Sequence, residues 1–170
     1  MEPTYLLTEA GRQDMLLHLG IRFDMDLRAE ADAKGDALGA NVLHRHYPVD
    51  MYSAILNEEN DELVRAVFAE LADPDNYPVY LHCTTGRGRT GTVCYLLEAL
   101  LGVSDRDLYR EYELTTFALG NVVFEEFIAF TTRIDVMEGN TTQEKVENYL
   151  LSIGVTPEEI ESIRSIFLED

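Results

Sequence analysis

Residues 82–91 constrain the fold more than any other stretch of this chain. They read His-Cys-Thr-Thr-Gly-Arg-Gly-Arg-Thr-Gly. The apolar run at 79–81 that precedes them predicts a buried strand, and the apolar run at 92–101, closed by Gly102, predicts a helix. The segment is therefore expected to be a strand, a glycine-rich loop and a helix. In that arrangement the N–H groups of the loop and of the helix N-terminus can converge on one bound anion.

The loop carries a thiol at its start and a guanidinium at its end, because five residues separate Cys83 from Arg89. A cysteine beside a helix N-terminus and an arginine should have a lowered pKa and form a thiolate near neutral pH. The planar fork of Arg89 can hold two oxygens of a phosphoryl group. The hydroxyl of Thr90 can turn toward the sulfur and stabilise it as a leaving group. Glycines at 86, 88 and 91 permit positive φ and close approach of the backbone to a ligand.

The pattern of His-Cys, five residues and Arg-Thr-Gly resembles the signature loop of the cysteine-dependent protein-tyrosine-phosphatase superfamily. Residues 8–28, 80–119 and 141–167 resemble its compact bacterial branch, which includes secreted tyrosine and lipid phosphatases. That branch usually has Lys-Asp before the arginine, where this chain has Arg87 and Gly88. A basic residue followed by glycine is closer to the loop of the phosphoinositide phosphatase and tensin homologue. This departure concerns the substrate class and not the type of reaction.

The resemblance implies hydrolysis of phosphomonoesters through a cysteinyl-phosphate intermediate, without a metal or another cofactor. Cys83 would be the nucleophile, Arg89 would hold the equatorial oxygens, and Thr90 would assist departure of the sulfur. His82 would tune the thiol from behind. The remaining phosphate-binding positions would be Thr84, Thr85, Gly86, Arg87 and Gly88.

Asp50 is the candidate general acid by resemblance, because the acid of this superfamily sits on a loop about as far before the cysteine. Here the separation from Cys83 is 33 residues. An alkoxide or phenoxide leaves poorly unless a carboxylic acid protonates it. The alternatives Glu58, Glu59 and Asp61 are typical of first-turn acids that complement a helix dipole.

Other readings of the loop and of nearby residues stay open. A silent phosphate-binding relative, a rhodanese or an arsenate reductase could share the cysteine and the arginine. Phosphotyrosine and other aryl phosphates are the first expected substrate class, and phosphoinositides or inositol polyphosphates are the second.

His44 and His46 share a strand face, but nothing nearby completes a metal ligand set. Cys94 lies in an apolar helical run and is typical of a small buried residue, not of a redox partner for Cys83.

The amino-acid composition limits the classes of molecule that this chain is expected to bind. It has 32 acidic and 13 basic residues and a formal net charge of −19. This charge disfavours nucleic acid and anionic membranes at long range, so the expected partner is a phosphorylated protein, lipid or small molecule. No stretch is long and apolar enough to span a membrane. No signal peptide is visible either, and both a cytoplasmic and a secreted location remain open, as does the oligomeric state.

The order of predicted elements favours one α/β domain over residues 1–170, with a mostly parallel sheet flanked by helices. Strands are expected at 21–27, 42–47 and 79–81, and helices after Thr8, over 58–72, after Ser104, over 122–135, after Thr141 and after Thr156. The loop that carries Cys83 would lie at the carboxyl end of the central strand. Family members usually have segments before the first helix that are not visible here.

Overall fold

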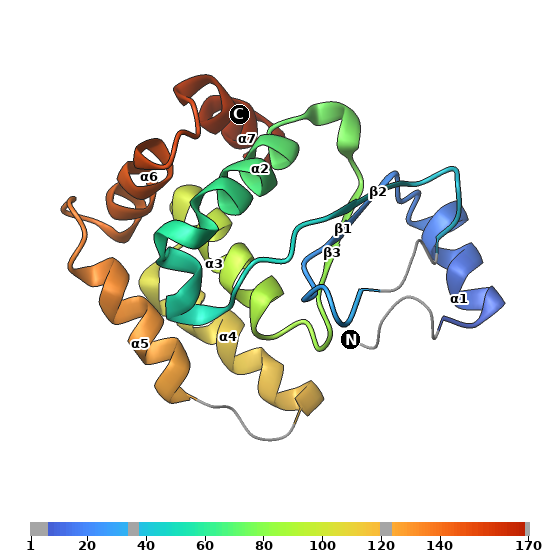
Figure 1. Ribbon diagram of the computed structural model, residues 1–170, viewed down its shortest axis with the longest axis horizontal. Coiled ribbons are helices and arrows are strands. Elements are labelled where there is room, and N and C mark those ends of the chain that lie inside the picture. The colour runs from blue at the N-terminus through green and yellow to red at the C-terminus, as the bar shows by residue number, and fades with distance from the viewer. Residues whose placement is uncertain (1–6, 34–37, 120–123, 169–170) are drawn as a thin grey trace.

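The computed structural model describes residues 7–33, 38–119 and 124–168, without the side chains of 116–119. It confirms an α/β fold with a parallel sheet (Figure 1). The strands are β1 (Phe23–Asp26), β2 (Leu43–His46) and β3 (Val79–His82), and their order across the sheet is β2-β1-β3. In the described part of the chain β3 is therefore an edge strand. The prediction that a central strand leads into the loop is wrong, because no described strand pairs with the outer side of β3.

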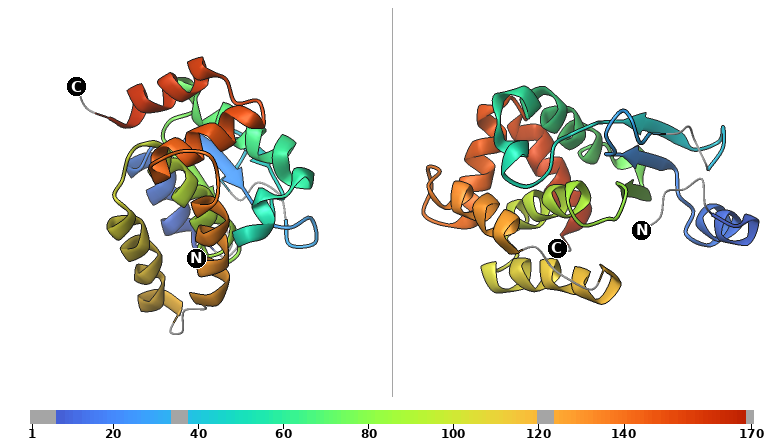
Figure 2. Two further views of the ribbon diagram at one scale, coloured as in Figure 1. Left: turned by 90° about the vertical axis from the view of Figure 1, so that its left-hand side faces the viewer. Right: turned by 60° about the horizontal axis from the view of Figure 1, so that its bottom comes forward.

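Helices α2 to α7 gather on one side of the sheet, and α1 lies apart from them beyond its other side (Figures 1 and 2). Short 3₁₀ segments at Tyr52–Leu56, Glu58–Asn60 and Pro74–Asn76 connect the larger elements. The helices are α1 (Glu9–Gln13, continued by a π turn at Asp14–His18), α2 (Asp61–Leu71), α3 (Arg89–Leu100), α4 (Asp105–Leu119), α5 (Phe124–Asp135), α6 (Thr142–Ser152) and α7 (Pro157–Phe167).

Most helices begin where the sequence predicts them, because their caps are local. The Thr156 hydroxyl accepts from the backbone N–H of Glu159, the Glu159 carboxylate accepts from the backbone N–H of Thr156, and Pro157 occupies the first turn. The hydroxyls of Thr8 and Thr141 cap α1 and α6 by accepting from the backbone N–H groups of Gly11 and Glu144. Residues 122–123, where a helix was expected to begin, lie outside the described residues, and α5 is described from Phe124.

The central strand β1 is buried on both faces. Phe23 and Met25 face the main apolar core with the helices, and Asp24 and Asp26 alternate with them toward the opposite face. The parallel register places Asp24 between His44 and Tyr80, and Asp26 between His46 and His82. This second face therefore carries a buried polar layer directly behind the start of the loop that follows β3.

Asp26 and Arg28 form a fully buried ion pair in this layer. The Nε atom of Arg28 donates to both carboxylate oxygens of Asp26, at 2.9 and 3.0 Å, and the backbone N–H of Arg28 also donates to the carboxylate. Burial raises the pKa of Asp26, but the hydrogen bonds from Arg28 outweigh it, and the net shift is downward. The charge of Asp26 is thus compensated within the fold.

Replacing Arg28 with methionine should lower the free energy of unfolding by about 3–5 kcal/mol, because it leaves the buried carboxylate of Asp26 without its cation. Urea denaturation of the two proteins measures the loss. Arg12→Met is the matched control, since Arg12 pairs with Glu9 on the surface and its loss should cost at most about 1 kcal/mol. Equal losses in the two variants would contradict the role given to Arg28.

Candidate active site

The predicted strand, glycine-rich loop and helix are confirmed as β3, residues 83–88 and α3; we call residues 83–88 the phosphate loop. Only Gly86 of its predicted glycines has a positive φ, of 77°. Gly91 lies within α3. Gly88 has a φ of −69° at the N-cap of α3. A Cβ there would lie 2.7 Å from the sulfur of Met51, so the Met51 side chain would have to shift.

The Cys83 side chain is buried at the base of the loop, with 3% of its surface exposed. Burial raises the pKa of its thiol. The Thr90 hydroxyl and the backbone N–H groups of Thr90, Thr85 and Gly86 act in the opposite direction and outweigh it, so the pKa of Cys83 is lowered. The loop therefore folds its N–H groups around the sulfur and favours the thiolate.

This shift predicts how Cys83 reacts with pH. Because its pKa is lowered, alkylation of Cys83 by iodoacetamide should have its midpoint below the ordinary value of about 8.5. Thr90→Val removes the hydroxyl and should move that midpoint upward. The measurement is the alkylation rate at Cys83 against pH, read by peptide mass spectrometry. A midpoint that is the same in both proteins would remove Thr90 from the thiolate site.

The loop opens into a pocket of about 280 Å³. Cys83 lies on its floor, and cationic, apolar and acidic side chains surround it. Arg87 and Arg89 are the cationic members, and Glu126 of α5 is the acidic one. Its other lining residues are Met51, Tyr52, Thr84, Thr85 and Gly88. The structure thus brings together the predicted nucleophile, Arg89 and four of the five predicted phosphate-binding positions, and it adds Met51, Tyr52 and Glu126. Gly86 and Thr90 are not among the lining residues of this pocket.

Two hydrogen bonds tie the phosphate loop and α3 to the segment that carries Asp50. The Nε atom of Arg89 donates to the carbonyl oxygen of Val49 at 2.9 Å. The Thr92 hydroxyl donates to the carbonyl of Gly88 at 2.7 Å and accepts from the backbone N–H of Tyr52 at 3.0 Å. Tyr52 has a φ of 53°, which is uncommon for a residue with a side chain. Such backbone strain persists where the surroundings hold it.

Asp50 lies beside the pocket but is not among its lining residues. Its side chain is exposed, and one carboxylate oxygen accepts from the side-chain amide of Asn60 at 3.1 Å. The backbone N–H of Asp50 donates back to the same amide at 2.9 Å. Its neighbour Met51 does line the pocket. Glu58, Glu59 and Asp61 occupy the first turns of a 3₁₀ segment and of α2.

His82 connects the start of the loop to the buried polar layer. Its Nε2 atom lies 2.9 Å from the Asp24 carboxylate, and its ring stacks on Tyr80 with 4.8 Å between ring centroids. The other oxygen of Asp24 lies 3.1 Å from the ring of His44. Asp24 therefore links two histidines and fixes the ring that precedes Cys83, a role that the sequence did not indicate.

His46 and Tyr52 each make a further polar contact near the site. The Nε2 atom of His46 lies 2.7 Å from the carbonyl of Arg28. Tyr52 and Tyr112 place their hydroxyls 3.2 Å apart. Within the described ranges no group of three histidine, cysteine or carboxylate side chains could hold a metal ion. No described helix has the length and apolar character needed to cross a membrane.

The α/β fold is that of the cysteine-dependent protein-tyrosine-phosphatase superfamily, and the sequence of residues 82–91 resembles its signature loop. Residues 4–169 match the model of the family described as the tyrosine phosphatase family. The chain belongs to that family.

Two curated relatives share part of this sequence. The first is a Dictyostelium discoideum protein named "Probable tyrosine-protein phosphatase DG1060", 30% identical over 83 residues, which are 49% of this chain and 50% of the relative. The second is OCA1 of Kluyveromyces lactis, also named provisionally as a tyrosine-protein phosphatase. It is 28% identical over 89 residues, which are 52% of this chain and 41% of the relative. The matched region thus spans half or less of each relative.

Proposed function

We propose that this chain hydrolyses phosphomonoesters, with phosphotyrosine and other aryl phosphates as its substrates and a cysteinyl phosphate on Cys83 as its intermediate. The observation that carries the proposal is the lowered pKa of a buried thiol, held by loop N–H groups at the base of a pocket that also contains Arg89. A protein that only binds phosphate has no use for an ionised thiol at that position.

In the first step the Cys83 thiolate attacks phosphorus, the bond to the leaving oxygen breaks, and that oxygen takes a proton from a carboxylic acid. In the second step water attacks phosphorus, the sulfur leaves as thiolate, and inorganic phosphate is released. Arg89 and the loop N–H groups would hold the equatorial oxygens in both steps. The Thr90 hydroxyl would stabilise the departing sulfur, and His82 would support the loop from behind.

Asp50 is the proposed acid of the first step and the proposed base of the second. It adjoins Met51 in the pocket wall, and the Arg89 bond to Val49 anchors the preceding residue. To reach the leaving oxygen its carboxylate has to exchange the Asn60 amide for the substrate, a change of side-chain rotamer on an exposed loop. Catalytic hydrogen bonds are often formed only once substrate is bound.

The pocket supports aryl phosphates over polyphosphates. Met51 and Tyr52 give one wall an apolar surface beside Cys83, which suits an aromatic leaving group. Glu126 places a carboxylate at the same pocket, where it repels a second phosphate group. Arg87 supports the alternative of a phosphoinositide or inositol polyphosphate substrate, because it adds a cation that a single phosphate held by Arg89 does not require.

The test is phosphate release by the chain from a phosphotyrosine peptide, an inositol polyphosphate and a short-chain phosphoinositide, each in excess EDTA. We expect turnover without metal and the highest kcat/KM on the phosphotyrosine peptide. A higher kcat/KM on the two polyanions, reduced selectively by Arg87→Gln, would favour the alternative substrate class. Binding of all three without any phosphate release would instead indicate a silent module that holds phosphorylated ligands.

A further inference from the structure

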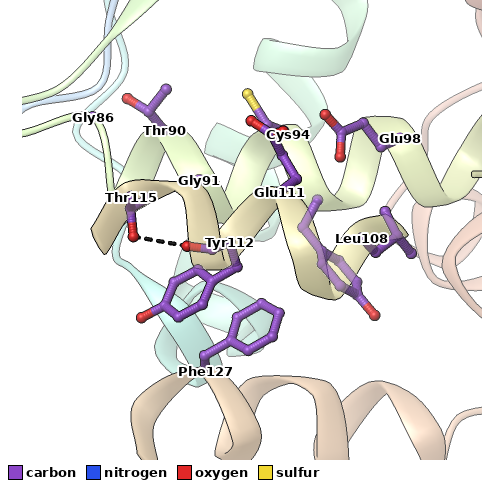
Figure 3. A pocket seen from close by; sticks show the side chains of 11 residues that line it. Gly86, Thr90, Gly91, Cys94, Glu98, Leu108, Glu111, Tyr112, Thr115 and Phe127 are labelled. Atoms are coloured by element: carbon purple, nitrogen blue, oxygen red, sulfur yellow. Dashed lines mark hydrogen bonds between the residues drawn. The ribbon is translucent and has the colours of Figure 1, made fainter. Parts of the chain in front are cut away.

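A second cavity, of about 160 Å³, borders the phosphate loop and shares no lining residue with the active-site pocket. It contacts the loop at Gly86 and the first turn of α3 at Thr90 and Gly91 (Figure 3). Its walls come from α3, α4 and Phe127 of α5. The reaction proposed above uses none of the side chains deeper in this cavity.

Helical spacing explains which side chains meet there. Cys94 and Glu98 follow Thr90 at intervals of four residues, so they lie along one face of α3. Glu111 and Thr115 are likewise four residues apart on α4, and both line the cavity. The Thr115 hydroxyl donates to the carbonyl of Tyr112 (Figure 3). The two helices therefore place two carboxylates and a thiol in one small cavity.

The floor of the cavity is apolar and aromatic. Tyr112 and Phe127 stack with 4.0 Å between their ring centroids and an interplanar angle of 5°, and Leu108 and Tyr95 complete the surface. A cavity of about 150 Å³ is known to accept a single benzene ring. The space between α3 and α4 is thus of the size of one aromatic group.

No cationic side chain of the described residues pairs with the carboxylates at this apolar site. Among the described side chains, neither Glu98 nor Glu111 has a hydrogen bond or an ion pair. Burial, and then the charge of Glu111, raise the pKa of Glu98, and burial raises the pKa of Cys94 to about 12. Glu98 is half-buried beside the apolar surface, where an acid is usually paired, whereas Glu111 is exposed. A positive group placed between them would relieve both desolvation and repulsion.

We propose that the cavity between α3 and α4 binds a small organic cation that consists of one aromatic ring and a short alkylammonium group. The ring would lie against Tyr112 and Phe127, and the ammonium would lie between Glu98 and Glu111. The thiol of Cys94 lines the site and takes no part in a covalent step. Binding at this site does not require the reaction proposed for Cys83 to occur.

The site adjoins the active-site pocket through two contacts. Gly86 and Thr90, which line the cavity, also donate the hydrogen bonds that hold the Cys83 sulfur. Tyr112 reaches the hydroxyl of Tyr52, which lines the active-site pocket. A ligand in the cavity would therefore touch groups that shape the phosphate site, so an effector is the function that best suits it.

The test is an NMR titration of the isotope-labelled full chain with phenethylammonium, with saturating inorganic phosphate present to fill the active site. We expect the largest amide shifts at Gly91, Glu98 and Thr115, and saturation at one site. The Glu98→Gln/Glu111→Gln double variant should bind about tenfold more weakly. Glu62→Gln/Glu158→Gln is the matched control, since it makes the same charge change on exposed residues of α2 and α7, and its affinity should not change.

Two related compounds separate specific binding from general attraction of cations to an acidic protein. Neutral 2-phenylethanol and ring-free ethylammonium should each bind much more weakly than phenethylammonium. Equal weakening in the two double variants, equal affinity for 2-phenylethanol, displacement by phosphate, or an absence of saturable shifts would each overturn the proposal. Because the titration involves no turnover and can be repeated with Cys83→Ser, its failure is distinct from a failure of the proposed hydrolysis.

Discussion

Cys83→Ser should lower turnover of an aryl phosphate on the order of 10⁴-fold or more, as the loss of a catalytic nucleophile does elsewhere. The hydrogen bonds from Thr90, Thr85 and Gly86 that lower the pKa of the thiol cannot ionise a serine hydroxyl at neutral pH, since its pKa is far higher. The measurement is kcat from steady-state phosphate release. Affinity for inorganic phosphate should persist, because Arg89 and the loop N–H groups remain.

Cys94→Ser is the matched control for that substitution. Both cysteines are free and lie in one loop–helix unit, but Cys94 lines the second cavity and not the active-site pocket. We expect its kcat to stay within a few-fold of the native value. Full activity in Cys83→Ser, or an equal loss in both variants, would show that the reaction does not depend on Cys83.

Asp50→Asn should lower kcat by about 10²–10⁴-fold on substrates with poor leaving groups. Asparagine keeps the shape of the side chain and a hydrogen bond to Asn60, so the fold is preserved and only the proton is lost. The loss should shrink as the leaving group becomes more acidic, because a stable phenoxide needs no proton.

Glu126 is the alternative candidate for the general acid, because it lines the pocket and Asp50 does not. Glu126→Gln tests this alternative in the same assay. We expect Glu126→Gln to leave the leaving-group dependence unchanged and to raise kcat/KM for polyphosphorylated substrates. If Glu126→Gln shows the leaving-group effect and Asp50→Asn does not, the acid of this site is on α5 and the assignment from sequence is wrong.

The strand, the loop and the caps were predictable because their causes are local. Glycines, an apolar run and Thr-x-x-Glu patterns act within a few residues, and β3, α3 and α7 begin close to where the sequence indicates. The apolar spacing of α5 was less informative. Ile128 lies four residues after Phe124, at helical spacing, but it is 50% exposed, whereas Phe127 and Phe130 are buried. Packing against α6 and the 3₁₀ segment at 52–56 sets the rotation of the helix.

The polar parts of the site were not predictable, because they depend on contacts between distant segments. Asp24 reads as the outward residue of an alternating strand, yet it is buried between His82 and His44 once three strands pair in register. Thr92 bonds the backbone of Tyr52 across 40 residues of chain. Glu126 enters the pocket only because α5 packs beside the Tyr52 segment. These three contacts join segments that are far apart in the chain, so no local sequence pattern predicts them.

The measurement that tests the central claim most directly is trapping of the intermediate. The chain would be mixed with an aryl phosphate that has a good leaving group, quenched with acid during turnover, digested and examined by mass spectrometry. The account predicts one phosphoryl group on the peptide that contains Cys83, and none in the Cys83→Ser variant. Continued release of phosphate with Cys83 unmodified at every time point would contradict it.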